Sequence, residues 1–337
     1  MRFFILPKTN KINIFFCIFL VICIIFVSVA PIYILPKTYK NYNFDTLKKS
    51  NGVFCELWEV DTFEGGTNSR SKFLENVAMA FEKQNKGVYV IVRTLTIDQV
   101  KLMLSQDKMP DVISFGIGAG QTLQYTCQEM NVDTKNIRRT LVESGTYKNV
   151  QLAYPWCMGG YVLCSQSVDV SQDFGKDKTL GVGVENNVPP NNGFANVTKF
   201  DTQYDAYKAY LNKEFDILLG TQRDYFRVSN KISLGMLEKN YYHYIDSYTD
   251  LIQYVACVTL DKSIQSYVFK FIDYLLSEKI QSKLTSIGMF GVTDKSIYQG
   301  TDYDQFEEAI LRINKFQNVF QDDITLQQKR DDLYSKS

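Results

Sequence analysis

The sequence predicts an α/β fold with two lobes, preceded by an apolar N-terminal segment. Strand and helix patterns alternate along residues 53–115, which is typical of a parallel sheet with right-handed crossover helices. A second apolar region begins near residue 152 and carries strand and helix patterns of its own. The chain has 337 residues, which is enough for two domains of ordinary size and a tail.

The first lobe begins with Val53–Val60, an alternating stretch that predicts a strand. An amphipathic helix is expected over Ser69–Gln84, where Asn85-Lys86-Gly87 supplies a stop signal. Val88–Val92 is a continuous apolar run, typical of a strand covered on both faces. A capping-box pattern predicts a helix over Ile97–Ser105, and the next strand is expected over Pro110–Phe115.

The second half is less regular. Residues 165–196 are polar and rich in glycine and proline, which indicates loops. The patterns further along predict helices over Gln203–Lys213, Lys262–Ser277 and Phe306–Phe320, and strands over Phe215–Leu219 and Val255–Leu260.

The N-terminal segment is a candidate membrane helix. Ile12–Pro36 carries no charge and is longer than the ~20 apolar residues that span a bilayer. Arg2, Lys8 and Lys11 precede it and favour a cytoplasmic N-terminus. Ser28-Val29-Ala30 fits a signal-peptidase site, but Pro31 after it disfavours cleavage. Residues 1–37 are therefore expected to be an uncleaved anchor, with a cleaved signal as the alternative, and residues 38–52 a linker.

Composition excludes several classes of function. Lys and Arg total 37 and Asp and Glu total 37, so no net basic field exists to bind nucleic acid. His243 is the single histidine, and no Cys-x-x-Cys spacing occurs, so no metal site and no cofactor are expected. No Gly-x-Ser-x-Gly elbow and no P-loop is present, so the chain is not expected to be an enzyme.

Several segments together resemble extracellular solute-binding proteins of carbohydrate-uptake ABC transporters, distant relatives of maltose-binding protein. The segments that carry the resemblance are Leu57–Arg70, Phe81–Val90, Pro110–Ile113, Tyr154–Tyr161, Leu219–Asp224 and Leu275–Gln281. The resemblance implies a type II periplasmic-binding-protein-like fold on the outer side of the membrane. It also implies a small solute, a sugar by analogy, and the permease subunits of an ABC transporter as partners. This chain is short for the family and lacks its lipoprotein cysteine.

The resemblance also implies how the chain divides between the lobes. Lobe 1 is expected to comprise 53–150 plus 255–290, and lobe 2 to comprise 151–254 plus 291–337. Crossings between them are expected near Val150–Trp156 and Ser247–Val258.

Ligand-binding candidates cluster after predicted strands, because α/β sheets bind ligands at the carboxyl ends of their strands. Trp58, Trp156 and Tyr154 could stack on a sugar ring, or be core residues. Arg223 could donate a fork of hydrogen bonds, or pair with Asp224 or Asp216. The remaining candidates are Glu64, Gly65, Gly66, Thr67, Ser114 and Gly116. The structural alternative is a solvated loop carboxylate for Glu64 and a helix cap for Thr67.

The predicted function is capture of a small solute between the two lobes for uptake. A protein of the same fold that senses a ligand, or that has lost ligand binding and serves at the surface, stays open as an alternative. A glycosidase is the less favoured alternative, because many carboxylates are present but no motif places a pair of them.

Overall fold

The computed structural model describes residues 52–63, 65–171, 177–183 and 193–334, and Val53–Ser337 form one compact unit. Within the described residues every helix is too short or too polar to span a bilayer. The predicted membrane segment Ile12–Pro36 lies outside them.

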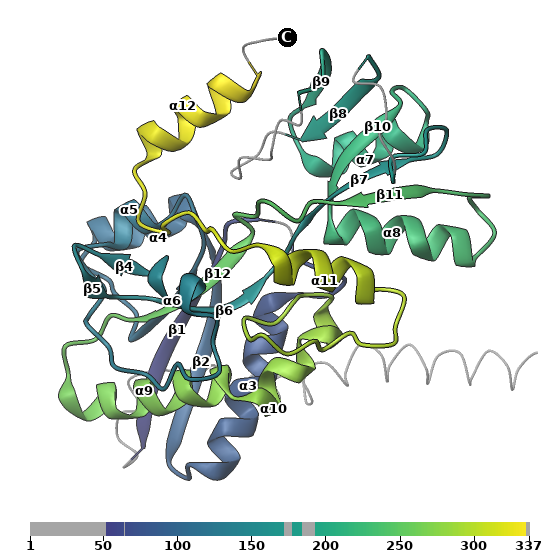
Figure 1. Cartoon of the computed structure of the whole chain (residues 1–337). Helices are drawn as coiled ribbons and strands as arrows, with labels where there is room; N and C mark the ends of the chain where they lie inside the picture. Colours follow the sequence, from purple (N-terminus) through teal and green to yellow (C-terminus); the bar gives the residue numbers. More distant parts are fainter. Residues whose placement is uncertain (1–51, 64, 172–176, 184–192, 335–337) are drawn as a thin grey trace, which may run out of the picture. The chain divides into compact units, whose positions relative to one another are not determined.

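A first five-stranded sheet runs in the order β2-β1-β3-β12-β6 (Figure 1). β1 is parallel to β2 and to β3, whereas β12 is antiparallel to β3 and to β6. The bounds are β1 Val53–Asp61, β2 Val88–Thr96, β3 Val112–Phe115, β6 Tyr154–Met158 and β12 Ile252–Cys257. The parallel part of this sheet confirms the predicted α/β class.

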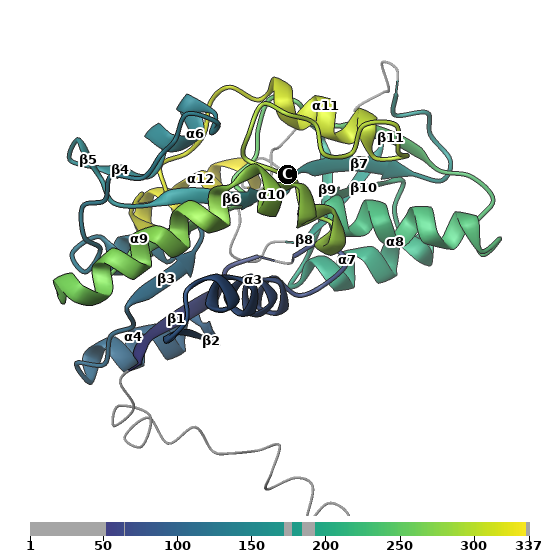
Figure 2. The same cartoon turned by 90° about the horizontal axis from the view of Figure 1, so that it is seen from below.

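Helices follow the first strands as the patterns predict. α3 (Arg70–Gln84) packs on β2 and lies beside α9 (Lys262–Leu276) (Figure 2). The rings of Phe81 on α3 and Phe271 on α9 meet edge to face. α4 (Ile97–Ser105) begins with the predicted capping box. One expectation was wrong: β2 is an edge strand, so Tyr89 is exposed although the run around it is apolar.

The second sheet runs in the order β11-β7-β10-β8-β9. β10 is parallel to β8 and antiparallel to β7, so this sheet is mixed. The bounds are β7 Tyr161–Ser165, β8 Thr179–Gly183, β9 Asn196–Phe200, β10 Ile217–Thr221 and β11 Tyr241–Tyr244. α7 (Gln203–Leu211) and α8 (Gln222–Ser233) pack against it.

The chain passes from the first sheet to the second between Met158 and Tyr161, through Gly159 and Gly160. It returns between Tyr244 and Ile252. The two connections are joined by hydrogen bonds, because the Gly159 N–H donates to the Leu251 carbonyl and the Thr249 hydroxyl donates to the Gly159 carbonyl. The exact assignment of residues to lobes stays a prediction.

Short elements complete the unit. Their bounds are α5 Gly120–Leu123, α6 Arg139–Glu143, β4 Thr146–Tyr147, β5 Val150–Gln151, α10 Glu278–Gln281, the 3₁₀ helix η1 Ser282–Ile287, α11 Asp304–Arg312 and α12 Asp323–Tyr334. The predicted helix Phe306–Phe320 was wrong in its second half, because α11 ends at Arg312 and α12 starts only at Asp323.

Candidate functional site

A cavity of about 600 Å³ opens at the carboxyl end of β1. It is lined by the last residues of β1, the loop after it and the first turn of α3, together with one residue of β2 and one of α8. The lining residues are Glu59, Asp61, Thr62, Phe63, Gly65, Thr67, Asn68, Ser69, Arg70, Ser71, Thr94 and Arg223. This volume lies within the range of small-molecule pockets, ~300–1,000 Å³.

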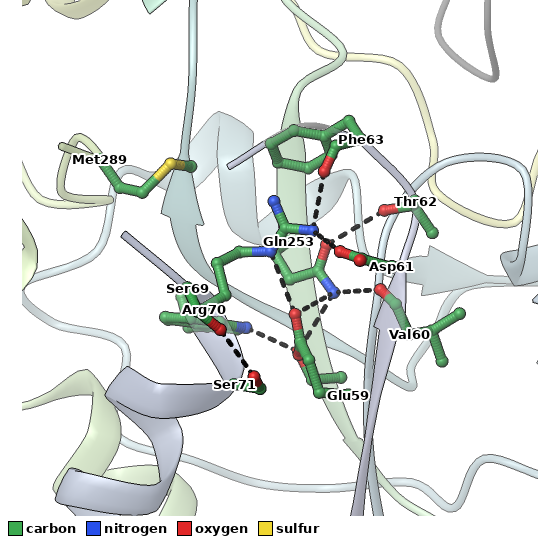
Figure 3. Close-up of polar contacts among 12 residues, drawn as sticks. Glu59, Val60, Asp61, Thr62, Phe63, Ser69, Arg70, Ser71, Gln253 and Met289 are labelled. Atoms are coloured by element: carbon green, nitrogen blue, oxygen red, sulfur yellow. Dashed lines mark hydrogen bonds and ion pairs between the residues drawn. The ribbon is translucent and has the colours of Figure 1, made fainter. Parts of the chain in front are cut away.

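Arg70 lines the cavity, is buried, and bonds several acceptors around it (Figure 3). Arg70 Nε lies 3.0 Å from Glu59 Oε1, and Nη2 lies 2.9 Å from both Asp61 Oδ1 and the Phe63 carbonyl oxygen. The guanidinium also lies over the Phe63 ring, with 4.3 Å between its carbon and the ring centroid. Glu59 and Asp61 are two residues apart on β1 and so point to the same face. Arg70 reaches both because it begins the helix that follows.

The Glu59 carboxyl is held by a hydrogen-bonded network from the neighbouring strands. Gln253 on β12 donates through Nε2 to Glu59 Oε1 and to the Val60 carbonyl, and accepts from the Thr62 hydroxyl. Burial raises the pKa of Glu59, and the nearby Arg70 charge opposes that rise. The network fixes the orientation of a charged pair that water does not reach.

The loop after β1 is fixed by the last residues of η1 and by Gly288, which follows it. The Asn68 side-chain amide donates to the Ser286 carbonyl at 2.8 Å. A Cβ on Gly66 would lie 2.0 Å from the Ile287 oxygen and 2.3 Å from the Gly288 oxygen, so only glycine allows this approach. The loop that lines the cavity is therefore held by backbone packing.

The second sheet contributes Arg223, near the start of α8. Thr221 caps this helix by accepting from the Arg223 N–H, and Asp224 accepts from the Thr221 N–H in return. Arg223 is half-buried and lines the cavity together with the residues of β1 and α3.

The two tryptophans are in the core and line no part of this cavity. Trp58 is fully buried and donates from its indole nitrogen to Glu56 Oε1. It precedes Glu59 on the strand, and adjacent strand residues point to opposite faces. Trp156 is also fully buried, stacks on Phe73 and donates to the Ser114 hydroxyl. The stacking role on a sugar does not fit these positions, whereas the alternative of a core residue does.

Several other candidates pack inside the protein and do not line the cavity. Tyr154 is buried and its hydroxyl donates to the Met130 carbonyl. Ser114 is fully buried beneath Gln253, and Gly116 packs where a Cβ would lie 2.4 Å from the Thr62 hydroxyl oxygen. Gly66 packs against the backbone at the end of η1, which leaves no space for a side chain. Of the candidates, Gly65, Thr67 and Arg223 do line the cavity, and Glu64 lies outside the described residues.

Sequence reasoning missed the residues at the centre of the site. Arg70 is not among the ligand-binding candidates, yet it is 4% exposed and lines the cavity. The signal that could have found it is the alternation Glu59-x-Asp61 at the end of a buried strand, followed by an arginine at the next helix start. A carboxylate buried at a strand end is normally paired with a cation, and the first residue of the next helix can supply one.

No group of three or more His, Cys, Asp or Glu side chains within the described ranges is placed to hold a metal ion. The polar lining instead offers hydroxyls, an amide, two carboxylates and two guanidinium groups. Such a set can hydrogen-bond a small polar solute without covalent chemistry.

No protein family model matches the sequence, and no curated protein matches it. Solved structures do match its fold. The GacH receptor of Streptomyces glaucescens, studied unliganded and with acarbose, has a TM-score of 0.61 at 8% identity, covering 85% of this chain and 94% of that one. The sugar-binding protein MalE of Xanthomonas citri has a TM-score of 0.57 at 11% identity, with coverages of 85% and 93%. An ABC transporter substrate-binding protein from Bradyrhizobium japonicum has a TM-score of 0.55 at 8% identity, with coverages of 85% and 99%.

The chain thus has the two-sheet α/β fold of type II periplasmic binding proteins, the fold of ABC-transporter substrate-binding proteins. The resemblance seen in the sequence is confirmed at the level of the fold. The ligand is not fixed by a fold, because unrelated functions share folds and differ in their sites.

Proposed function

We propose that this protein captures a small polar solute on the outer face of the membrane and delivers it to an ABC transporter. The observation that carries the proposal is the cavity at the carboxyl end of β1, to which Arg223 of the second sheet also contributes. A site of this kind lies where open α/β sheets bind ligands. The solved structures of this fold include a sugar-binding protein, which supports a carbohydrate as the first candidate.

The lining supports a solute rich in hydrogen-bonding groups. Thr62, Thr67, Ser69, Ser71 and Thr94 bring hydroxyls, whereas Phe63 is the one aromatic residue among the lining residues. Arg70 covers one face of that ring, so stacking contributes less to binding than the sequence suggested. Recognition therefore rests on hydrogen bonds more than on aromatic faces.

The experiment that tests capture is a thermal-shift screen of the full-length protein in detergent. Sugars, oligosaccharides and short peptides are added at millimolar concentration, and binding of a solute to the native state raises Tm by mass action. Mass spectrometry of the recovered solute checks that it is released unchanged. A screen in which no solute raises Tm, or in which a glycoside is hydrolysed, would contradict the proposal.

The membrane tether is part of the same proposal. The uncharged segment Ile12–Pro36 is long enough to anchor the chain, and Pro31 disfavours its cleavage. The protein should fractionate with membranes and keep its N-terminus. N-terminal sequencing of the mature protein that begins at Pro31 or later would contradict an uncleaved anchor.

A further inference from the structure

Arg70 has more hydrogen-bond donors than the chain uses. A guanidinium carries five N–H donors. Nε and Nη2 are engaged by Glu59, Asp61 and the Phe63 carbonyl. Nη1 is buried and has no hydrogen-bond partner in the described part of the chain. It is turned away from both carboxylates (Figure 3).

An unpartnered buried donor on a charged group is costly, because the group has lost water and gained nothing in exchange. Residue 65 is a glycine and has no side chain that could cover Nη1. A Cβ built on Gly65 would lie 3.5 Å from Nη1. Both residues line the cavity. Nη1 is therefore the one side of this buried cation that the protein leaves for another acceptor.

The first turn of α3 adds donors at the same place. Ser69, Arg70 and Ser71 line the cavity at the start of a helix of 15 residues. The first N–H groups of a helix have no carbonyl partner within it, and the helix dipole makes this end positive. Ser69 Oγ accepts from the Lys72 N–H, so the cap uses one donor of this turn and leaves others.

The acidic groups of the cavity do not cancel this excess of donors. Asp61 has 65% of its side chain exposed, so solvent screens its charge. Glu59 is fully buried, and its Oε1 accepts from Arg70 Nε, so its charge is paired within the chain. Arg223 of α8 brings a second guanidinium to the cavity.

We propose that the captured solute carries an oxyanionic group, a carboxylate or a phosphate, which binds Arg70 Nη1 and the first turn of α3, with Arg223 contributing from α8. An acidic sugar would satisfy both this inference and the hydroxyl-rich lining. The inference rests on the proposed function, because it names the chemical class of the solute in the same cavity.

Matched pairs of probes test the anionic class on the full-length protein in detergent. Glucuronate and glucose 6-phosphate are compared with glucose, and acetate and inorganic phosphate serve as the bare anions. The acidic member of each pair should raise Tm, and the shift should shrink as NaCl is raised. The probe that gives the larger rise in Tm, the carboxylate or the phosphate, identifies which anion the site prefers.

Two variants and a control place the anion in the cavity. Gly65→Ala adds a methyl at ordinary contact distance from Nη1, so it should block the anion while the Tm of the unliganded protein stays the same. Arg223→Gln should weaken Kd for the acidic probe about 10- to 100-fold, as expected for a lost charge-assisted hydrogen bond. Arg227→Gln removes another half-buried arginine of α8, which pairs with Asp224 and does not line the cavity, and should leave Kd unchanged.

The outcomes separate the two proposals. Stabilisation by glucose equal to that by its acidic counterparts would overturn the anionic class and leave solute capture standing. Acidic probes that bind equally well to wild type, Gly65→Ala and Arg223→Gln would overturn the assigned site. If no acidic probe and no neutral solute binds, both proposals are overturned.

Discussion

At the scale of single residues, strand alternation decides which side chains reach the cavity. Trp58 and Glu59 are neighbours on β1, yet Trp58 enters the core and Glu59 lines the cavity. The sequence predicted the correct strand end and loop, because glycines and small polar residues mark them. The sequence did not predict which face of β1 would line the cavity, since that depends on the packing of α3 and β12 around Glu59.

Glycine substitutions on the cavity loop should separate packing from binding. Gly66→Ala should lower the free energy of unfolding by about 1–3 kcal/mol, because its Cβ would overlap the Ile287 and Gly288 oxygens and the loop must shift. Gly65→Ala is the matched control, with its nearest atoms 3.5 Å away. Chemical denaturation measures both. Equal stability of the two variants would show that the loop is not held against Ile287 and Gly288.

Buried thiols should make the protein sensitive to alkali. Burial raises the pKa of Cys55, Cys127 and Cys257 from 9.0 to about 12. The unfolded thiols lose protons above pH 9, whereas the folded ones keep theirs until about pH 12. Their contribution to stability is thus complete below pH 9 and is lost as the pH rises through this window.

The expected slope for each thiol approaches 1.4 kcal/mol per pH unit inside the window. Denaturant titrations between pH 8 and pH 11 on wild type and Cys127→Ala measure the difference in slope. The variant should lose stability less steeply, whatever its stability at neutral pH. Parallel slopes would mean that the Cys127 thiol is not protected by burial.

At the scale of elements, the sequence predicted those with strong local signals. α3 and α4 begin within one residue of the expected positions, because Ser69 and Thr96 supply recognisable caps. α8 is not among the expected helices, although Thr221 and Asp224 form a capping box at its start. β8 was read as a loop, because Thr179–Gly183 contains two glycines and its pairing is entirely with distant strands.

Loss of the α8 cap should therefore have a measurable cost. Thr221→Ala removes the acceptor for the Arg223 N–H and should lower stability by about 1 kcal/mol. It should also weaken binding of an acidic solute, because Arg223 sits on the turn that the cap orders. Thr198→Ala, at an exposed position of β9, is the control and should change stability by less than about 0.5 kcal/mol. An unaltered denaturation midpoint in Thr221→Ala would argue against the cap.

At the scale of the whole molecule, the sequence predicted two connections between two α/β parts. The connections in the structure are Gly159–Gly160 and residues 245–251, so the first comes after the expected range Val150–Trp156; hydrogen bonds join the two. Their positions depend on strand pairing across almost one hundred residues, as in β6 with β12, so a local pattern could locate them only approximately.

These connections should act as a hinge when a solute binds. Arg70 and Arg223 belong to parts built on different sheets, and both can engage one small solute fully only if the parts approach. Spin labels at Met79→Cys on α3 and Leu234→Cys after α8 report that approach, since the native side chains are 48% and 62% exposed. The five native cysteines of the described chain are buried, and Cys17 and Cys23 are replaced by serine, so labelling is confined to the introduced thiols.

Saturation with a solute found by the thermal-shift screen should shift the Met79–Leu234 distance by more than about 2 Å, measured by electron double resonance. The matched pair Met79→Cys and Leu260→Cys lies on α3 and on the loop between β12 and α9, which both belong to the part built on the first sheet, and it should keep its distance. Tyr161→Phe removes the hydrogen bond from the Tyr161 hydroxyl to Asp250 Oδ1, which ties the start of β7 to the return connection. It should broaden the distance distribution of the unliganded protein, because a looser hinge samples more orientations. A distance that stays the same at saturation would show that the solute binds without closure, and the hinge would then have no part in capture.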